Sequence, residues 1–159
     1  GTACNNKPRG MTNGFKIIGI SCRTTNKNNQ SQRDLGELWN QFYAAGIMEK
    51  IPAKNSATVL SVYTDYESDF TGAYTVIIGV SVNSLEHIPA GLTGREFGPE
   101  NFRKFIARGK MPDAVVNTWM EIWQNDQELR RKYSYDFESY GPDSQSGENA
   151  VVEIYIATF

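Results

Sequence analysis

Acidic and aromatic side chains alternate in the stretch KYSYDFESY, which runs from Lys132 to Tyr140. Asp136 and Glu138 lie there among four aromatic rings, with no Cys or His close by. A carboxylate surrounded by rings is poorly solvated, so its pKa rises unless a cation comes near it. The simpler interpretation is an ordinary half-buried strand whose alternation turns both acids toward water. Taken alone, the residues of this stretch favour that simpler interpretation.

A similar phrase occurs earlier in the chain, in the stretch VYTDYESD at residues 62–69. Its segment DYE at 65–67 has the same acid–ring–acid order as the segment DFE at 136–138. A sequence motif that occurs twice in one chain suggests an internal repeat. The elements around both copies decide whether the whole unit is duplicated.

Familiar catalytic motifs are absent from the sequence. It contains no nucleophile elbow, phosphate loop, dinucleotide fingerprint, zinc-protease helix or Cys-x-x-Cys pair. His87 is the only histidine and lies in a predicted loop beside Pro89, without an oriented partner. Cys22 ends a predicted strand and is expected to be an inert packed thiol. We therefore expect no catalytic residue among the usual nucleophiles and bases, no metal site and no cofactor.

The composition is that of an ordinary globular protein. Of the 159 residues, 40% are hydrophobic and 21% are charged, which allows a core and argues against disorder. The net charge of -2 and the pI near 5.5 give no reason to expect binding to nucleic acid or to an anionic membrane. No apolar run approaches the ~20 residues that span a bilayer. Two cysteines favour a reducing cytoplasm over a disulfide framework.

The first half of the chain predicts the order strand, helix, strand, strand. Residues 15–23 (FKIIGISCR) are β-branched and apolar, as in a strand covered on both faces. A helix follows, with Ser31 and Asp34 spaced as in a capping box and Gly46 suited to its end. Residues 58–68 and 72–82 are predicted as two strands joined by a turn. The helix carries apolar residues near helical spacing at Leu35, Leu38, Trp39, Phe42 and Ile47.

The second half repeats this order after a connection rich in Gly and Pro at residues 83–100. A strand is predicted at 101–109, a helix at 111–124, and two further strands at 133–140 and 150–159. Rings on both helices must meet the sheet. Burial in the core is the simpler role for some of them, but Trp often lines a cleft because its N–H needs a partner. These rings belong to Trp39, Phe42, Trp119 and Trp123.

We interpret the two halves as a degenerate tandem duplication of one strand–helix–strand–strand unit, which gives an α+β fold. Phe15 then matches Phe102, Trp39 matches Trp119, and segment 65–67 matches segment 136–138. Neither unit would bury much surface alone, so the two are expected side by side with a shared cleft. The predicted domain is 14–159, with repeats at about 15–82 and 101–158 and a linker at 83–100. Residues 1–13 are expected to be a disordered lead-in or an expression remnant.

In order and spacing, these segments resemble the GyrI-like effector-binding domains, which also form the ligand-sensing half of some AraC-type and MerR-type regulators. The resemblance runs from about Phe15 to Thr158. It is carried by FKIIGIS, LWNQF, VYTDYES, YTVIIGVSV, IPAGL, FIARG, TWMEIW, YDFESY and VEIYIA. The chain is also similar to free-standing members carried in integron gene cassettes, which lack the DNA-binding half.

The resemblance implies an antiparallel sheet with two main helices, a pseudo-twofold axis relating the repeats, and a central ligand cleft. It implies that Glu138 serves as counter-charge to a cationic, aromatic ligand. The physical chemistry agrees, because a cation over a ring face gains ~0.5–2 kcal/mol and the carboxylate adds a charge pair. The expected ligand-binding residues are Glu138, Trp119, Tyr66, Tyr155, Trp39 and Phe137.

The primary prediction is a stand-alone cytoplasmic protein that senses or sequesters a small hydrophobic cation, rather than an enzyme. Two alternatives stay open: a small hydrolase of strained electrophiles that uses Glu138, Tyr66 and Trp119, and a purely structural partner-binding domain. No helix-turn-helix segment is visible in the sequence, so direct nucleic-acid binding is not expected. A separate DNA-binding partner protein and a homodimer both remain open.

Overall fold

The computed structural model describes residues 13–159, so the prediction for residues 1–13 lies outside the described part except for Asn13. The strands are β1 (Phe15–Thr25), β2 (Lys54–Thr64), β3 (Ala73–Val82), β4 (Thr93–Phe97), β5 (Phe102–Arg108), β6 (Tyr135–Tyr140) and β7 (Val151–Ala157). The helices are α1 (Gln30–Ala44), α2 (Ile47–Lys50), α3 (Asp113–Gln124) and α4 (Asp126–Leu129), with 3-10 turns η2 (Lys27–Asn29), η3 (Pro142–Gln145) and η4 (Gly147–Asn149).

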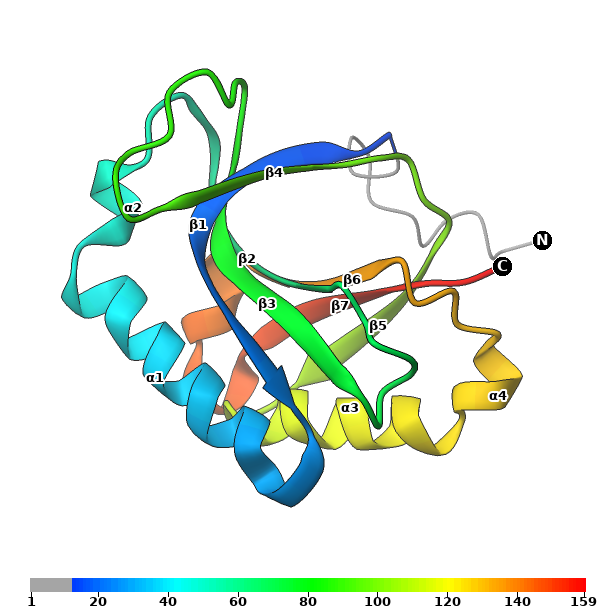
Figure 1. Cartoon of the computed structure of the whole chain (residues 1–159). Helices are drawn as coiled ribbons and strands as arrows, with labels where there is room; N and C mark the ends of the chain where they lie inside the picture. The colour runs from blue at the N-terminus through cyan, green and yellow to red at the C-terminus, as the bar shows by residue number, and fades with distance from the viewer. Residues whose placement is uncertain (1–12) are drawn as a thin grey trace.

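The seven strands form one antiparallel sheet in the order β4-β1-β3-β2-β6-β7-β5. The predicted α+β class and the two strand–helix–strand–strand units are confirmed: β1-α1-β2-β3 is followed by β5-α3-β6-β7. The units join edge to edge where β2 pairs with β6, with Ser61 opposite Glu138. Figure 1 shows the sheet strongly curved, with α1 and α3 against the same face.

Two local expectations were wrong. The segment 83–100 contains β4, which pairs with β1 from Phe15↔Phe97 to Gly19↔Thr93 and forms one edge of the sheet. Its Gly and Pro content concealed this short strand. The predicted capping box is absent as well: α1 starts at Gln30, and Asp34 accepts hydrogen bonds from Thr24 and from Gln30 instead.

The match between segments 65–67 and 136–138 is also wrong at the level of structure. β2 ends at Thr64, so segment 65–67 lies in the loop beyond it, whereas segment 136–138 lies inside β6. Asp65 has a positive φ of 50° and receives a bidentate ion pair from Arg95. The first copy of the motif, segment 65–67, therefore anchors a loop, while the second copy, segment 136–138, belongs to the sheet.

The apolar core lies on both faces of the curved sheet. On the helix side, β1, β2 and β3 pack against Leu38 and Phe42 of α1, while β5 and β7 pack against Val115 and Ile122 of α3. The opposite face buries a second aromatic layer that includes Phe97, Phe102, Tyr135, Phe137 and Tyr155. No helix within residues 13–159 has the length and apolar character needed to cross a membrane.

A pair of glycines permits close approach of β1 and β3. Gly19 lies directly opposite Gly79 in the ladder. A Cβ built on Gly19 would lie 2.0 Å from the carbonyl oxygen of Ile78, and one on Gly79 would lie 2.2 Å from that of Ile18. Because a side chain at either position would force the strands apart, glycine at both positions is what allows β1 and β3 to pair here.

Candidate functional site

A cavity of about 520 Å³ lies between α1 and α3 over the middle of the sheet. Both repeats contribute to it, as expected for a cleft at their junction. Its polar lining includes Asn26, Gln32 and the exposed Asp113. Its aromatic lining consists of Trp39, Tyr63, Tyr66, Phe70, Tyr74, Trp119, Trp123 and Tyr140.

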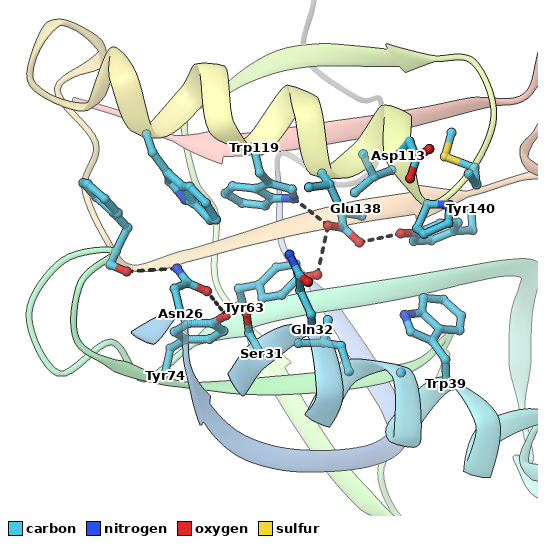
Figure 2. A pocket seen from close by; sticks show the side chains of 18 of the residues that line it. Asn26, Ser31, Gln32, Trp39, Tyr63, Tyr74, Asp113, Trp119, Glu138 and Tyr140 are labelled. Carbon is cyan, nitrogen blue, oxygen red and sulfur yellow. Dashed lines mark hydrogen bonds between the residues drawn. The ribbon is translucent and has the colours of Figure 1, made fainter. Parts of the chain in front are cut away.

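Glu138 lies at the centre of this cavity and is only 2% exposed. Its Oε2 accepts hydrogen bonds from the Tyr63 hydroxyl at 2.9 Å and from Trp119 Nε1 at 2.6 Å. Its Oε1 accepts a hydrogen bond from the Tyr140 hydroxyl at 2.6 Å. Figure 2 shows these donors converging on the carboxylate from the sheet and from α3. The strand register explains the convergence, because Ser61 opposite Glu138 puts Tyr63 on the same face, one diagonal step away.

The carboxylate of Glu138 has neutral partners and no positive one. Burial raises its pKa above the ordinary glutamate value, and the three hydrogen bonds only partly offset that shift. Burial, and then the charge of Glu138, raise the pKa values of the Tyr63 and Tyr140 phenols, so both keep their protons and donate. No ion pair among the described residues includes Glu138. The site thus holds a desolvated acid that forms no ion pair with a cationic side chain among residues 13–159.

The neighbouring acid, Asp136, is in the opposite situation. It is fully buried and accepts hydrogen bonds from Tyr66 at 2.5 Å, from Arg131 Nη2 at 2.8 Å and from the backbone N–H of Ala157 at 2.8 Å. Burial raises its pKa, and the guanidinium of Arg131 opposes that shift. The guanidinium also lies 4.3 Å from the ring centroid of Tyr133. Asp136 is therefore neutralised within the fold.

Four of the six predicted ligand-binding residues line the cavity: Glu138, Trp119, Tyr66 and Trp39. Phe137 and Tyr155 do not. They are paired across β6 and β7, stack at a centroid distance of 4.7 Å, and belong to the aromatic layer on the other face of the sheet. The expectation that they line the cleft needs correction, because alternation along β6 turns Phe137 away from the side that Glu138 faces.

The structure also brings in residues that the sequence did not single out. Tyr140 follows Glu138 by two positions on the same strand, so strand parity alone would have placed it beside the acid. Tyr63 depends on the β2–β6 register, which the sequence does not specify. Arg131 follows α4 in a left-handed turn at Arg130 and was not expected at the site.

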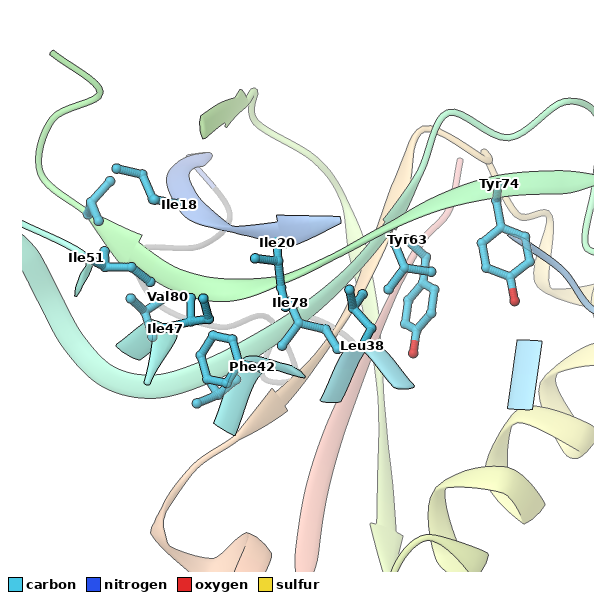
Figure 3. Packing of buried hydrophobic residues seen from close by; sticks show 13 residues of the cluster. Ile18, Ile20, Leu38, Phe42, Ile47, Ile51, Tyr63, Tyr74, Ile78 and Val80 are labelled. Carbon is cyan, nitrogen blue, oxygen red and sulfur yellow. The ribbon is translucent and has the colours of Figure 1, made fainter. Parts of the chain in front are cut away.

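One wall of the cavity continues the core of the first repeat. Figure 3 shows this cluster extending from Ile18 and Ile51 to Tyr63 and Tyr74. The Tyr74 hydroxyl donates to Asn26 Oδ1 at 2.6 Å, and Asn26 Nδ2 donates to the Phe70 carbonyl at 2.9 Å. The wall is therefore tied both to the apolar core and to the β2–β3 loop. These contacts fix the aromatic rings of the wall in place.

No group of three or more His, Cys, Asp or Glu side chains suited to a metal ion occurs within residues 13–159. Besides Arg131, which is paired with Asp136, and the exposed Asp113, the cavity offers aromatic surface, neutral hydrogen-bond donors and the buried acid Glu138. Such a combination is suited to non-covalent binding of an apolar molecule that bears a positive charge.

Comparison with known proteins identifies the family. Residues 11–158 match the family described as Cass2, integron-associated effector binding protein. The chain belongs to this family. A Cass2-type solved structure, an integron cassette protein from the mobile metagenome of Vibrio cholerae, is 34% identical. It superposes with a TM-score of 0.72, and the match covers 92% of each chain.

Two further comparisons show a similar sequence in one protein and a similar fold in another. YobU of Bacillus subtilis (strain 168), whose name describes it as a candidate transcriptional regulator, is 26% identical over 145 residues, which cover 89% of this chain and 91% of YobU. The structure of SAV2435 bound to tetraphenylphosphonium shares the fold, with a TM-score of 0.75 and 21% identity over 92% of this chain and 90% of that one.

Proposed function

We propose that this Cass2-family protein binds a hydrophobic organic cation in the cavity between α1 and α3, with Glu138 as the counter-charge. One observation carries the proposal: Glu138 is buried at the cavity centre with three neutral donors and no ion-pair partner among the described residues. A buried acid in that state is costly unless a cation arrives. The cation would supply what the fold leaves out.

The aromatic lining supports the same ligand class. The rings of Trp39, Trp119 and Trp123 offer apolar area to a hydrophobic body and π faces to a positive charge. Each favourable contact of a cation with a ring face contributes about 0.5–2 kcal/mol, the larger value where water is excluded. Arg131 does not compete for Glu138, because its guanidinium is held by Asp136. An anionic ligand, in contrast, would meet the buried carboxylate directly.

The comparisons support this proposal at the level of family and fold. The family is described as effector-binding, and the same fold in SAV2435 is seen bound to tetraphenylphosphonium. We accordingly assign the protein a role in sensing or sequestering a small hydrophobic cation in the cytoplasm. A separate DNA-binding protein that reads the bound state would complete a regulatory role.

Charge selectivity tests the proposal in the unmodified protein. Tetraphenylphosphonium and tetraphenylborate have nearly the same shape and opposite charges. We expect saturable binding of the phosphonium, with quenching of tryptophan emission. The borate should bind roughly 100-fold or more weakly than the phosphonium, because like charges in a desolvated site cost several kcal/mol. Isothermal titration calorimetry measures both constants. Equal affinities would show that the cavity selects shape alone and would overturn the proposal.

Cation affinity is also expected to depend on pH. The pKa of Glu138 is raised in the free protein, and a bound cation favours the ionised form. Affinity is then full above the raised pKa, falls as the pH is lowered through it, and is accompanied by proton release in that range. Titrations with tetraphenylphosphonium from neutral pH down to the lowest pH at which the protein stays folded measure this slope. An affinity that stays constant across the range in the parent protein would contradict it.

A further inference from the structure

The cavity has an internal symmetry that centres on Glu138. In an antiparallel ladder, two directly paired residues are related by a local twofold axis. Ser61 and Glu138 are such a pair. Tyr63 lies two residues beyond Ser61, and Tyr140 lies two residues beyond Glu138, so the same axis relates the two tyrosines. Both direct their hydroxyls to the one carboxylate.

The two helices complete this symmetry with a tryptophan each. The ring of Trp119 on α3 meets Tyr63 at 5.4 Å between centroids and 71° between planes. The ring of Trp39 on α1 meets Tyr140 at 4.8 Å and 70°. The two edge-to-face pairs thus have nearly the same geometry. This also agrees with the match of Trp39 to Trp119 drawn from the sequence.

Each Trp–Tyr pair forms one half-site: the first is Tyr63 with Trp119, and the second is Tyr140 with Trp39. Each combines a helix of one repeat with a strand of the other. Figure 2 shows Glu138 between the half-sites, with Trp119 and Tyr63 on one side and Trp39 and Tyr140 on the other. The counterpart of Glu138 on β2 is Ser61, which brings no charge. Two matching aromatic half-sites therefore flank one central acid.

We propose that the ligand carries its positive charge at its centre, between two apolar arms that occupy the two half-sites. This inference rests on the proposed function and specifies its ligand class. With a central charge near Glu138, one arm reaches each Trp–Tyr pair, and both pairs lose water on binding. A cation whose charge lies at one end covers only one half-site when its charge is near Glu138. The second half-site then stays hydrated, and its apolar surface contributes nothing.

Two isomeric ammonium ions separate these cases. Dibenzyldimethylammonium has a central charge and two benzyl arms, whereas (biphenyl-4-ylmethyl)trimethylammonium has the same molecular formula with both rings on one side of the charge. We expect the central-charge isomer to bind roughly 10- to 100-fold more tightly, the factor that burial of one more phenyl-sized group provides. Calorimetric titration of the unmodified protein gives the ratio. Equal affinities, or preference for the terminal-charge isomer, would overturn the inference and leave the proposed function intact.

Removal of one half-site tests the same idea from the protein side. Trp39→Ala leaves the three donors to Glu138 in place. The affinity for the terminal-charge isomer, bound next to Trp119, should therefore change by about twofold or less. The ratio of affinities that favours the central-charge isomer should fall to roughly threefold or less. Trp39→Leu keeps apolar packing against Phe42. It should lower the same affinity ratio by a smaller factor, and it replaces the alanine variant in the experiment if that variant does not fold.

Tyr43→Ala is the matched control for this experiment. Tyr43 stacks on Trp39 at 5.9 Å but is 59% exposed and lies outside the cavity lining. Its removal should leave the isomer ratio unchanged. A preference that survives Trp39→Ala and Trp39→Leu at full size would contradict the half-site account. If neither isomer binds at millimolar concentration while tetraphenylphosphonium does, this inference fails and the proposed function stands. If tetraphenylphosphonium does not bind either, both fail.

Discussion

Arg131→Met is expected to lower the free energy of unfolding by about 3–5 kcal/mol, the cost of leaving a buried charge without its partner. Arg131 is 7% exposed, and Asp136 beneath it is fully buried. Without the guanidinium, Asp136 keeps only the Tyr66 hydroxyl and the Ala157 N–H as donors. The ring of Tyr133 also loses its cation contact. Urea denaturation followed by circular dichroism measures the loss.

Arg130→Met is the control for that measurement. Arg130 is the preceding residue, and its side chain is exposed. Its backbone is left-handed, a conformation that Arg and Met adopt at similar cost. Surface substitutions of this kind change stability by about 0.5 kcal/mol or less. An Arg131→Met variant as stable as Arg130→Met would mean that Asp136 is not held as a charged partner, and the contrast between the two acids of β6 would be lost.

That contrast divides the stretch DFESY into two roles. Asp136 ties β6 to the α4 turn through Arg131 and to β7 through the N–H of Ala157. Glu138, two residues further on the same face, has phenol and indole donors alone. Replacement of an internally paired acid destabilises the fold, whereas under the proposed function replacement of Glu138 should weaken cation binding.

The fold was accessible from the sequence because its signals are local and occur twice. Alternating apolar strands and amphipathic helices recur in the same order in both halves, so the α+β class and the two repeats could be predicted. The β4 edge strand could not, since a five-residue segment with Gly94 beside a Pro-rich loop carries little periodicity. The predicted match of segment 65–67 with segment 136–138 was wrong because sequence similarity does not reveal that β2 ends at Thr64.

The site was only partly accessible, for a different physical reason. Glu138 and Trp119 were expected from the resemblance, and Trp39 from the duplication. Phe137 and Tyr155 were expected at the cleft although alternation along the strand turns Phe137 to the opposite face from Glu138. The role of Tyr63 depends on a register between strands 75 residues apart in the chain. Registers of that kind are set by the packed sheet rather than by local sequence.

Glu138→Gln is expected to reduce the affinity for a hydrophobic cation by about 2–5 kcal/mol, the range for loss of one partner of a desolvated charge pair. That corresponds to roughly 30- to 4,000-fold in Kd. The substitution keeps the size of the side chain and removes its charge. Gln can still accept from Tyr63 and Trp119 through its carbonyl and donate to the Tyr140 oxygen, because a phenol also accepts. The cavity should therefore keep its shape.

The same variant should become more stable at neutral pH. The folded-state pKa of Glu138 is raised by burial, so its contribution to stability is fully present at low pH and is lost as the pH rises through that value. Gln does not titrate and avoids that loss. Parent and variant should have equal Tm values in acid, and the variant should have the higher Tm at neutral pH. A lower Tm for Glu138→Gln at neutral pH would indicate a structural role for the carboxylate.

The most direct test of the central claim is the Kd of tetraphenylphosphonium, measured by calorimetry on the parent, Glu138→Gln and Glu67→Gln. Glu67 is the second acid of segment 65–67. It is exposed in the loop after β2 and lies outside the cavity lining. The account predicts a loss of roughly 30-fold or more for Glu138→Gln and a change of about twofold or less for Glu67→Gln. If Glu138→Gln binds the phosphonium as tightly as the parent, Glu138 is not the counter-charge and the account is contradicted.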